Sequence, residues 1–190
     1  TMYDTSQFRK GLKIELDGVP YSIVEFQHVS PGKGSAFVRT RIKNLLRNTV
    51  IERTFKSGDK VDTPDMEQRE VQFLYIDGDH FYFMDQSNFE QTVLDRSLLA
   101  EAADFLHENL VIQVLFHNSK AIAVELPNSV ILKIVETDPG LKGDTVSGAT
   151  KIAMLESGGK ISVPLHLKEG EFVKVDTREG TYIEKVNARV

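Results

Sequence analysis

A hairpin pattern is found in the stretch Phe73-Leu74-Tyr75-Ile76-Asp77-Gly78-Asp79-His80-Phe81-Tyr82-Phe83. Two short runs rich in apolar and aromatic residues flank an Asp-Gly pair, and this pair readily adopts the positive φ values that tight hairpin turns require. The same arrangement occurs earlier in the chain, where Ile14-Glu15-Leu16 leads into Asp17-Gly18. Both stretches therefore predict antiparallel β-hairpins.

Strand signals continue towards the C-terminal end of the sequence. Residues 161–167, 172–175 and 181–186 are short strand candidates, separated by Lys168-Glu169-Gly170 and Arg178-Glu179-Gly180. Short strands at such even spacing, with turn residues between them, are typical of a small β-barrel. The fold class expected from the whole chain is all-β.

One helix is expected, from about Ser97 to Glu108. Its apolar residues recur at spacings of three and four, which places them on one face of a helix. They are Leu98, Ala102, Phe105 and Leu106. This face predicts a helix whose role is packing.

The composition is that of a globular protein and not of a membrane protein. Of the 190 residues, 41% are hydrophobic and 27% charged, which is usual for a globular protein. The longest apolar stretch, 110–116, is interrupted by Gln113 and is far shorter than the roughly 20 residues that span a bilayer. The N-terminal residues are polar and lack the basic and apolar segments of a secretory signal. We expect a cytoplasmic protein with no membrane partner.

Cysteine is absent from the sequence, which excludes disulfides, thiolate nucleophiles and zinc sites that use Cys ligands. No two of the five histidines have the His-x-x-x-His spacing of a metal site. These histidines are His28, His80, His107, His117 and His166. We therefore expect no metal site. No Ser-His-Asp or His-carboxylate grouping supports a reaction either, so no catalytic residue is expected.

Charge is distributed unevenly along the chain. Residues 1–64 hold 11 Lys and Arg against 7 Asp and Glu, residues 65–127 hold 3 against 12, and residues 128–190 hold 9 of each. The resulting charges of +4, −9 and 0 account for the net charge of −5. Such shifts suggest three modules, and the proline bonds Thr63-Pro64 and Pro127-Asn128 favour extended linkers at these joints.

A glycine-flanked lysine stands between two strand candidates in the first segment. Pro31-Gly32-Lys33-Gly34-Ser35 separates 21–24 from 36–38, so it is expected at the tip of a hairpin. Pro31 fixes its own φ, while the glycines allow a sharp, narrow turn. The amine of Lys33 could then enter a confined site, donate hydrogen bonds or be covalently extended. Taken alone, the motif also fits an ordinary solvated turn.

The sequence after Lys33 argues against a phosphate-binding P-loop, which requires Ser or Thr directly after the lysine and then a helix. Gly34 follows instead, and the alternation in 37–43 predicts a strand with Arg39, Arg41 and Lys43 on one face. These three cations could contact a phosphate backbone, or they could simply be solvated.

Ordered motifs along nearly the whole chain resemble the elongation factor P family of bacteria. In the first segment these are 8–14, the tip 31–34 with Ala36-Phe37, and 52–57. In the last segment they are Thr137-Asp138-Pro139-Gly140-Leu141-Lys142-Gly143-Asp144-Thr145, then Lys151-x-Ala153-x-x-x-x-Gly158-x-x-Ile161-x-Val163-Pro164, then Lys174-Val175-Asp176-Thr177-Arg178. A shared generic barrel would not reproduce all these blocks in order.

The resemblance implies three small barrels in an elongated, tRNA-like shape: an SH3-like domain in residues 1–64 and OB-type domains in 65–127 and 128–190. It implies a translation elongation factor, not an enzyme, that binds both ribosomal subunits between the P and E sites. There it would stabilise the P-site peptidyl-tRNA and promote peptide-bond formation at consecutive prolines. No DNA partner is implied.

The family also implies roles for particular residues. Lys33 would be the tip lysine that approaches the tRNA acceptor end. It would carry a covalent extension of β-lysyl or related type, added by a lysine-modifying ligase, with no other cofactor. Gly143, Asp144 and Thr145 would lie in a loop that contacts the small subunit and the E site. Ser30, where relatives often have lysine, leaves open which enzyme modifies Lys33.

The sequence also allows two other functions to be considered. A general single-stranded RNA-binding protein of OB type would stack bases on exposed aromatic rings. The candidates are Phe73, Tyr75, Phe81, Tyr82 and Phe83, although alternating residues of this kind usually fill a barrel core. An enzyme using Asp77 with Asp79, or Asp138 with Asp144, is disfavoured because both pairs lie in glycine-rich turns.

Overall fold

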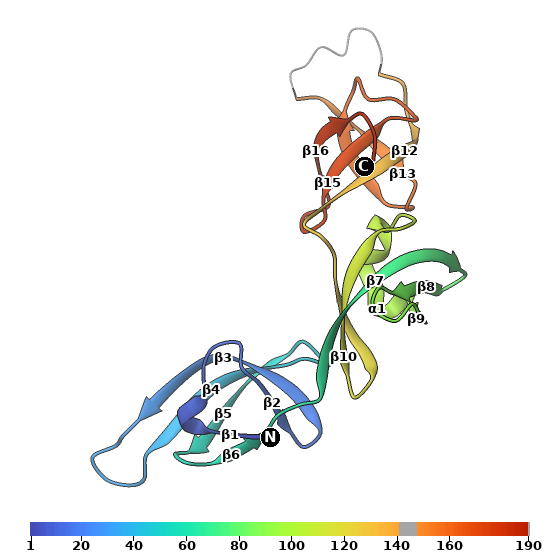
Figure 1. Cartoon of the computed structure of the whole chain (residues 1–190). Helices are drawn as coiled ribbons and strands as arrows, with labels where there is room; N and C mark the ends of the chain where they lie inside the picture. The colour runs from blue at the N-terminus through green and yellow to red at the C-terminus, as the bar shows by residue number, and fades with distance from the viewer. Residues whose placement is uncertain (141–147, 190) are drawn as a thin grey trace. The chain divides into compact units, whose positions relative to one another are not determined.

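Three β-sheets make up nearly all of the regular structure in the computed structural model, which describes residues 1–140 and 148–189 (Figure 1). Within these residues the sheets have six, five and five strands and follow one another along the sequence. The only helices described are three short ones of three to six residues. The predicted all-β fold class is confirmed.

The first sheet has the strand order β1-β6-β2-β3-β4-β5. Its strands are β1 (Met2–Asp4), β2 (Lys13–Leu16), β3 (Val19–Val29), β4 (Phe37–Asn44), β5 (Val50–Lys56) and β6 (Lys60–Asp62), with the short 3-10 helix η1 (Thr5–Gln7) after β1. As predicted, β2 and β3 form a hairpin in which Leu16 pairs with Val19. The turn residues Asp17 and Gly18 both have positive φ, 51° and 77°.

A small apolar core lies within the first sheet. Alternate residues of its strands point inward, as the two-residue period of a strand requires. The buried members are Phe8, Leu12, Ile14, Ile23, Val38, Ile42, Phe55 and Val61. This core supports the two long central strands, β3 and β4.

The middle sheet has the order β11-β10-β7-β8-β9. Its strands are β7 (Met66–Asp77), β8 (His80–Asp85), β9 (Gln91–Asp95), β10 (Val111–His117) and β11 (Lys120–Glu125). The hairpin predicted between β7 and β8 is confirmed, but its turn is Gly78-Asp79, with Gly78 at φ 60° and Asp77 still paired with His80.

The five aromatic residues of this hairpin divide between core and surface. Phe73, Phe81 and Phe83 are buried, whereas Tyr75 is half exposed and stacks on Tyr82 with ring centroids 4.5 Å apart. The expectation that alternating residues fill the core is therefore confirmed for the three phenylalanines, which are not accessible for stacking on bases.

The predicted helix from Ser97 to Glu108 is wrong in its extent. The segment consists of α1 (Arg96–Leu99) and the 3-10 helix η2 (Ala100–Phe105), and Ala100 between them has φ 49° and ψ −125°, outside any helical region. The Asp95 side chain caps α1 by accepting a hydrogen bond from the Leu98 amide. The break at Ala100 allows Phe105 to pack into the core of the third sheet.

The third sheet has the order β14-β13-β12-β15-β16 and is antiparallel throughout. Its strands are β12 (Ser129–Thr137), β13 (Thr150–Leu155), β14 (Lys160–Pro164), β15 (Phe172–Asp176) and β16 (Thr181–Val186). The strand expected over 161–167 is shorter than predicted, because the chain turns after Pro164, where the Leu167 amide bonds to the Pro164 carbonyl at 3.3 Å. The other two strand predictions are confirmed to within one residue.

The described chain groups into two compact units, residues 1–67 with 116–122, and residues 68–115 with 123–190. Within the first unit, Nε2 of the buried His117 lies 3.1 Å from Oε1 of Glu15. Within the second, the Ser157 hydroxyl donates to the Asp104 carbonyl, and a Cβ at Gly159 would lie 2.5 Å from the same oxygen. Gly159 therefore permits this close approach. The domain boundaries at residues 64 and 127 stay a prediction.

Within the described residues, no helix is both long and apolar enough to cross a membrane.

Candidate functional site

The Lys33 segment is the loop between β3 and β4, residues 30–36. Residues 31–35 are all exposed, as a hairpin tip requires. Of the two glycines beside Lys33, only Gly34 has a left-handed backbone, with φ 96°, and a conformation of this kind favours glycine. Lys33 has no hydrogen-bond or ion-pair partner among the residues that the structure describes. Its amine is free to bind or to react.

The base of the loop is held by strand pairing. Val29 of β3 pairs with Phe37 of β4, and the Arg39 guanidinium lies over the Phe37 ring, 5.9 Å from its centroid. Beyond β4, the Ser57 amide donates to the Ala36 carbonyl at 3.0 Å. The loop therefore extends from a paired and braced base.

Hydrogen bonds to Thr5 anchor the turn after β5 to the N-terminal segment. The Gly58 amide donates to Oγ1 of the buried Thr5 at 2.9 Å, and the Thr5 amide donates to the Asp59 carbonyl at 3.1 Å. Because Ser57 in this turn contacts Ala36, Thr5 braces the base of the loop through one intermediate. Sequence reasoning missed Thr5, because nothing in the sequence shows a contact 53 residues away.

The strand face predicted beside the loop is present. β4 and β5 pair without interruption from Phe37 to Lys43, so alternate residues of β4 share a side, and Arg39 and Arg41 are exposed while Lys43 is half-buried. A pocket on this face is lined by Lys10, Glu25, Phe26, Gln27, Arg39, Thr40, Arg41 and Glu52.

The electrostatics of this face are less uniform than the sequence suggested. Arg41 lies between Glu25 of β3 and Glu52 of β5 in the register, and its Nη1 is 3.7 Å from the Glu25 carboxylate. Arg39, by contrast, is flanked by the neutral Gln27 and Thr54. The two acidic neighbours could not be found from the sequence, since they depend on strand register. Arg39 is thus the less compensated cation.

The other predicted site residues belong neither to the Lys33 loop nor to β4. Gly143, Asp144 and Thr145 lie outside the described residues. Asp79 forms an ion pair with Arg96 at 3.2 Å. Among the residues that the structure describes, no group of three His, Cys, Asp or Glu side chains is placed to hold a metal ion.

Comparison with known proteins matches the three sheets one by one. The KOW-like domain of elongation factor P matches residues 4–61, its OB domain matches 66–124 and its C-terminal domain matches 130–185. Elongation factor P of Moorella thermoacetica is 54% identical over 184 residues, which cover 97% of this chain and 100% of that protein. The chain belongs to the elongation factor P family. The corresponding protein of Bdellovibrio bacteriovorus is 50% identical over 99% of this chain and 100% of its own length.

Membership of the elongation factor P family confirms the resemblance inferred from the motifs. It makes the chain a translation factor, not an enzyme, with a KOW-like or SH3-like first part followed by two OB-type parts. A solved structure described as eukaryotic translation initiation factor 5A from Methanococcus jannaschii aligns with a TM-score of 0.54 and 24% identity. That alignment covers 65% of this chain and 93% of the other and shows similarity of fold alone.

Proposed function

We propose that this factor binds both ribosomal subunits between the P and E sites and stabilises the P-site peptidyl-tRNA, so that peptide bonds form faster at consecutive prolines. The observation that carries the proposal is the exposed Lys33, which has no partner among the described residues and stands on a loop with a braced base. An amine held in this way can donate hydrogen bonds to the tRNA acceptor end and fix its position. The contribution is positioning of the reacting groups, while the ribosome performs the chemistry.

A covalent extension of Lys33 fits the same geometry. We propose a β-lysyl or related group, added by a lysine-modifying ligase. No intrachain contact in the described structure would have to be broken to attach it. Such an extension lengthens the reach and adds donors while the positive charge is retained.

The basic face of β4 supports contact with RNA. Arg39 is exposed and lacks an acidic neighbour in the strand register, so its charge is available to a phosphate. The 65–127 segment, with its charge of −9, would face away from RNA. For the loop at Gly143, Asp144 and Thr145, contact with the small subunit and the E site remains a proposal from the family alone.

The test is translation of a template encoding three consecutive prolines, with Lys33→Ala compared with Lys60→Ala, which removes an exposed lysine of β6. We expect Lys33→Ala to fold normally and to lose the relief of stalling, and Lys60→Ala to behave as the parent. Intact-mass measurement and peptide mapping of the native protein would locate the extension on Lys33. Relief of stalling by Lys33→Ala at the parent rate would show that the proposed role is wrong.

A further inference from the structure

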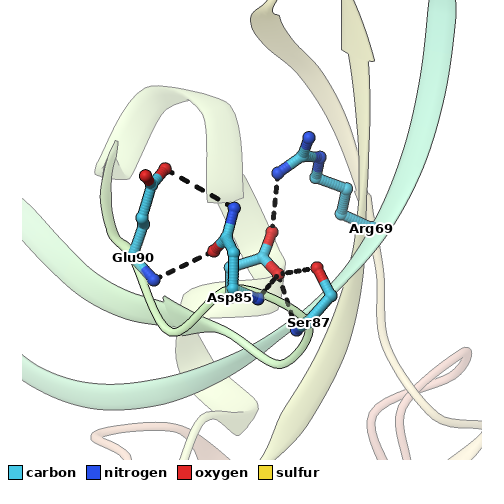
Figure 2. A network of polar contacts seen from close by, with 5 residues as sticks. Arg69, Asp85, Ser87 and Glu90 are labelled. Carbon is cyan, nitrogen blue, oxygen red and sulfur yellow. Dashed lines mark hydrogen bonds and ion pairs between the residues drawn. The ribbon is translucent and has the colours of Figure 1, made fainter.

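The connection between β8 and β9 is held by an unusually dense set of hydrogen bonds. Figure 2 shows the Asp85 carboxylate at its centre. It accepts from the Ser87 amide at 2.8 Å, the Ser87 hydroxyl at 2.6 Å and the Asn88 amide at 3.3 Å. Nη1 of Arg69, from the neighbouring strand β7, lies 3.0 Å from the other carboxylate oxygen. Asp85 itself is buried.

The far side of this loop is fixed as well. The Asn88 side chain accepts from the Glu90 amide at 2.9 Å and donates to the Glu90 carboxylate at 3.5 Å. The Phe89 amide donates to the Asp85 carbonyl at 2.9 Å, and the Asp85 amide donates to the Glu90 carbonyl at 2.8 Å. Asp85, Ser87, Asn88, Phe89 and Glu90 are therefore linked by hydrogen bonds within the loop.

This scaffold presents an aromatic side chain to solvent. Phe89 is 69% exposed, the highest value among the large exposed hydrophobic residues of the described chain, and its φ is 61°. A left-handed backbone suits glycine or asparagine, and a bulky residue in it is a conformational outlier. Its ring makes no contact with another aromatic ring in the described structure. The Phe89 ring therefore gains little packing within its own chain to offset the strain of the backbone. Strain of this kind, without local compensation, is expected at functional positions.

The surroundings of Phe89 are acidic. Glu90 follows it, and Glu70, whose carbonyl accepts a hydrogen bond from the Gln86 amide, lies beside the loop; both are exposed. Of the three cations in residues 65–127, Arg69 and Arg96 bind carboxylates of their own sheet. An exposed apolar side chain in such surroundings complements an apolar recess rimmed by Lys and Arg, whereas a phosphate backbone would be repelled.

We propose that the Phe89 loop is a docking element, and that the Phe89 ring inserts into an apolar recess on a basic protein of the ribosome. The inference rests on the proposed ribosome binding and adds to it a contact remote in sequence from Lys33. The Asp85 network holds the backbone of the loop that carries Phe89, so little backbone entropy is lost on docking. Aromatic side chains that fill a pocket at the centre of an interface often dominate its affinity.

Phe89→Asn tests the proposal, since asparagine tolerates the left-handed backbone but removes the ring. Affinity of the full chain for purified ribosomes should fall roughly tenfold, while the midpoint of thermal unfolding stays equal to that of the parent or rises. Phe89→Tyr should bind as the parent, and so should Ile152→Thr, which removes an apolar side chain of similar exposure from β13. Unchanged affinity of Phe89→Asn, or a lower unfolding midpoint, would overturn the proposal.

Photo-crosslinking identifies the partner. With p-benzoylphenylalanine in place of Phe89, irradiation of the ribosome complex should attach the factor to a basic ribosomal protein. Attachment to rRNA, or only within the factor, would contradict the inference. Failure of the parent protein to bind ribosomes would instead refute the proposed function. Normal binding by Phe89→Asn, together with an inactive Lys33→Ala, would refute the docking role alone.

Discussion

Arg39 and Arg41 lie on the same side of β4 but have different neighbours. The Glu25 and Glu52 side chains flank Arg41 and satisfy part of its charge, whereas Arg39 has only neutral neighbours across the strands. A cation already paired within its own chain gains less from a phosphate, because the first pair must be weakened. The residue that matters more for RNA binding should therefore be Arg39.

We predict that Arg39→Gln weakens ribosome binding several-fold and lowers the slope of log affinity against log salt by about one. Arg41→Gln should have a smaller effect on both quantities. Binding titrations at a series of salt concentrations would measure them. Equal losses from the two substitutions would show that the pairing with Glu25 does not persist in the complex.

Asp85 is expected to make the stability of the middle sheet depend on pH. Hydrogen bonds from the Ser87 hydroxyl and amide, with further ones from Arg69 and the Asn88 amide, lower the pKa of Asp85 from its ordinary value of 3.8 to about 2. Since the folded state favours the ionised form, this carboxylate stabilises the fold fully above its unfolded pKa. The contribution is lost as pH falls from about 4 through about 2.

Asp85→Asn should destabilise the protein by about 2 kcal/mol at neutral pH, because a buried charged acceptor is replaced by a neutral amide. The difference from the parent should shrink as pH falls from 4 to 2, as measured by urea unfolding across this range. Asp77→Asn, at an exposed site of the same sheet, serves as the control. A constant difference across the range would contradict the assigned role.

Among the secondary-structure elements, the two hairpin turns could be predicted from the sequence, but the extent of the helix after Asp95 could not. Asp17-Gly18 and the Asp77-Gly78 region determine their hairpins locally, so the sequence alone located both. The segment after Asp95 has a helical apolar spacing, yet Phe105 packs into the core of the third sheet. That long-range contact, together with the break at Ala100, decides the conformation. No local pattern contains this information.

Thr5 braces the base of the Lys33 loop through the turn after β5. Thr5→Val removes the oxygen that accepts a hydrogen bond from the Gly58 amide and should cost about 1–3 kcal/mol, since a part-buried donor is left unsatisfied. Hydrogen exchange should speed up at the Ser57 amide, which bonds to Ala36 at the base of the loop.

Thr40→Val is the matched control, because Thr40 is equally buried and its hydroxyl donates to the Arg53 carbonyl within the same sheet. It should lower the free energy of unfolding without selectively loosening the Ser57 amide. If both variants changed exchange at Ser57 alike, Thr5 would be a general stabilising residue with no particular link to the loop.

For the molecule as a whole, the sequence predicted the number and kind of parts better than their detailed boundaries. The order of motifs and the charges of +4, −9 and 0 indicated three successive β modules, and three sheets follow one another in the structure. The sequence located Lys33 and the side of β4 that carries Arg39. It could not show Glu25 beside Arg41, Arg69 bonded to Asp85, or residues 116–122 grouped with the first 67, because each depends on contacts between distant segments.

The position of His117 beside Glu15 has a consequence for how the protein is made. Residues 1–67 are synthesised before 68–115, and only then does the segment that completes the first compact unit exist. At roughly 5–20 residues per second, this interval lasts several seconds. In a nascent chain that ends before residue 116, Glu15 therefore lacks its His117 partner. The contacts of His117 and Asn118 with the first unit come from the β10–β11 hairpin, which the ribosome adds only after residue 115.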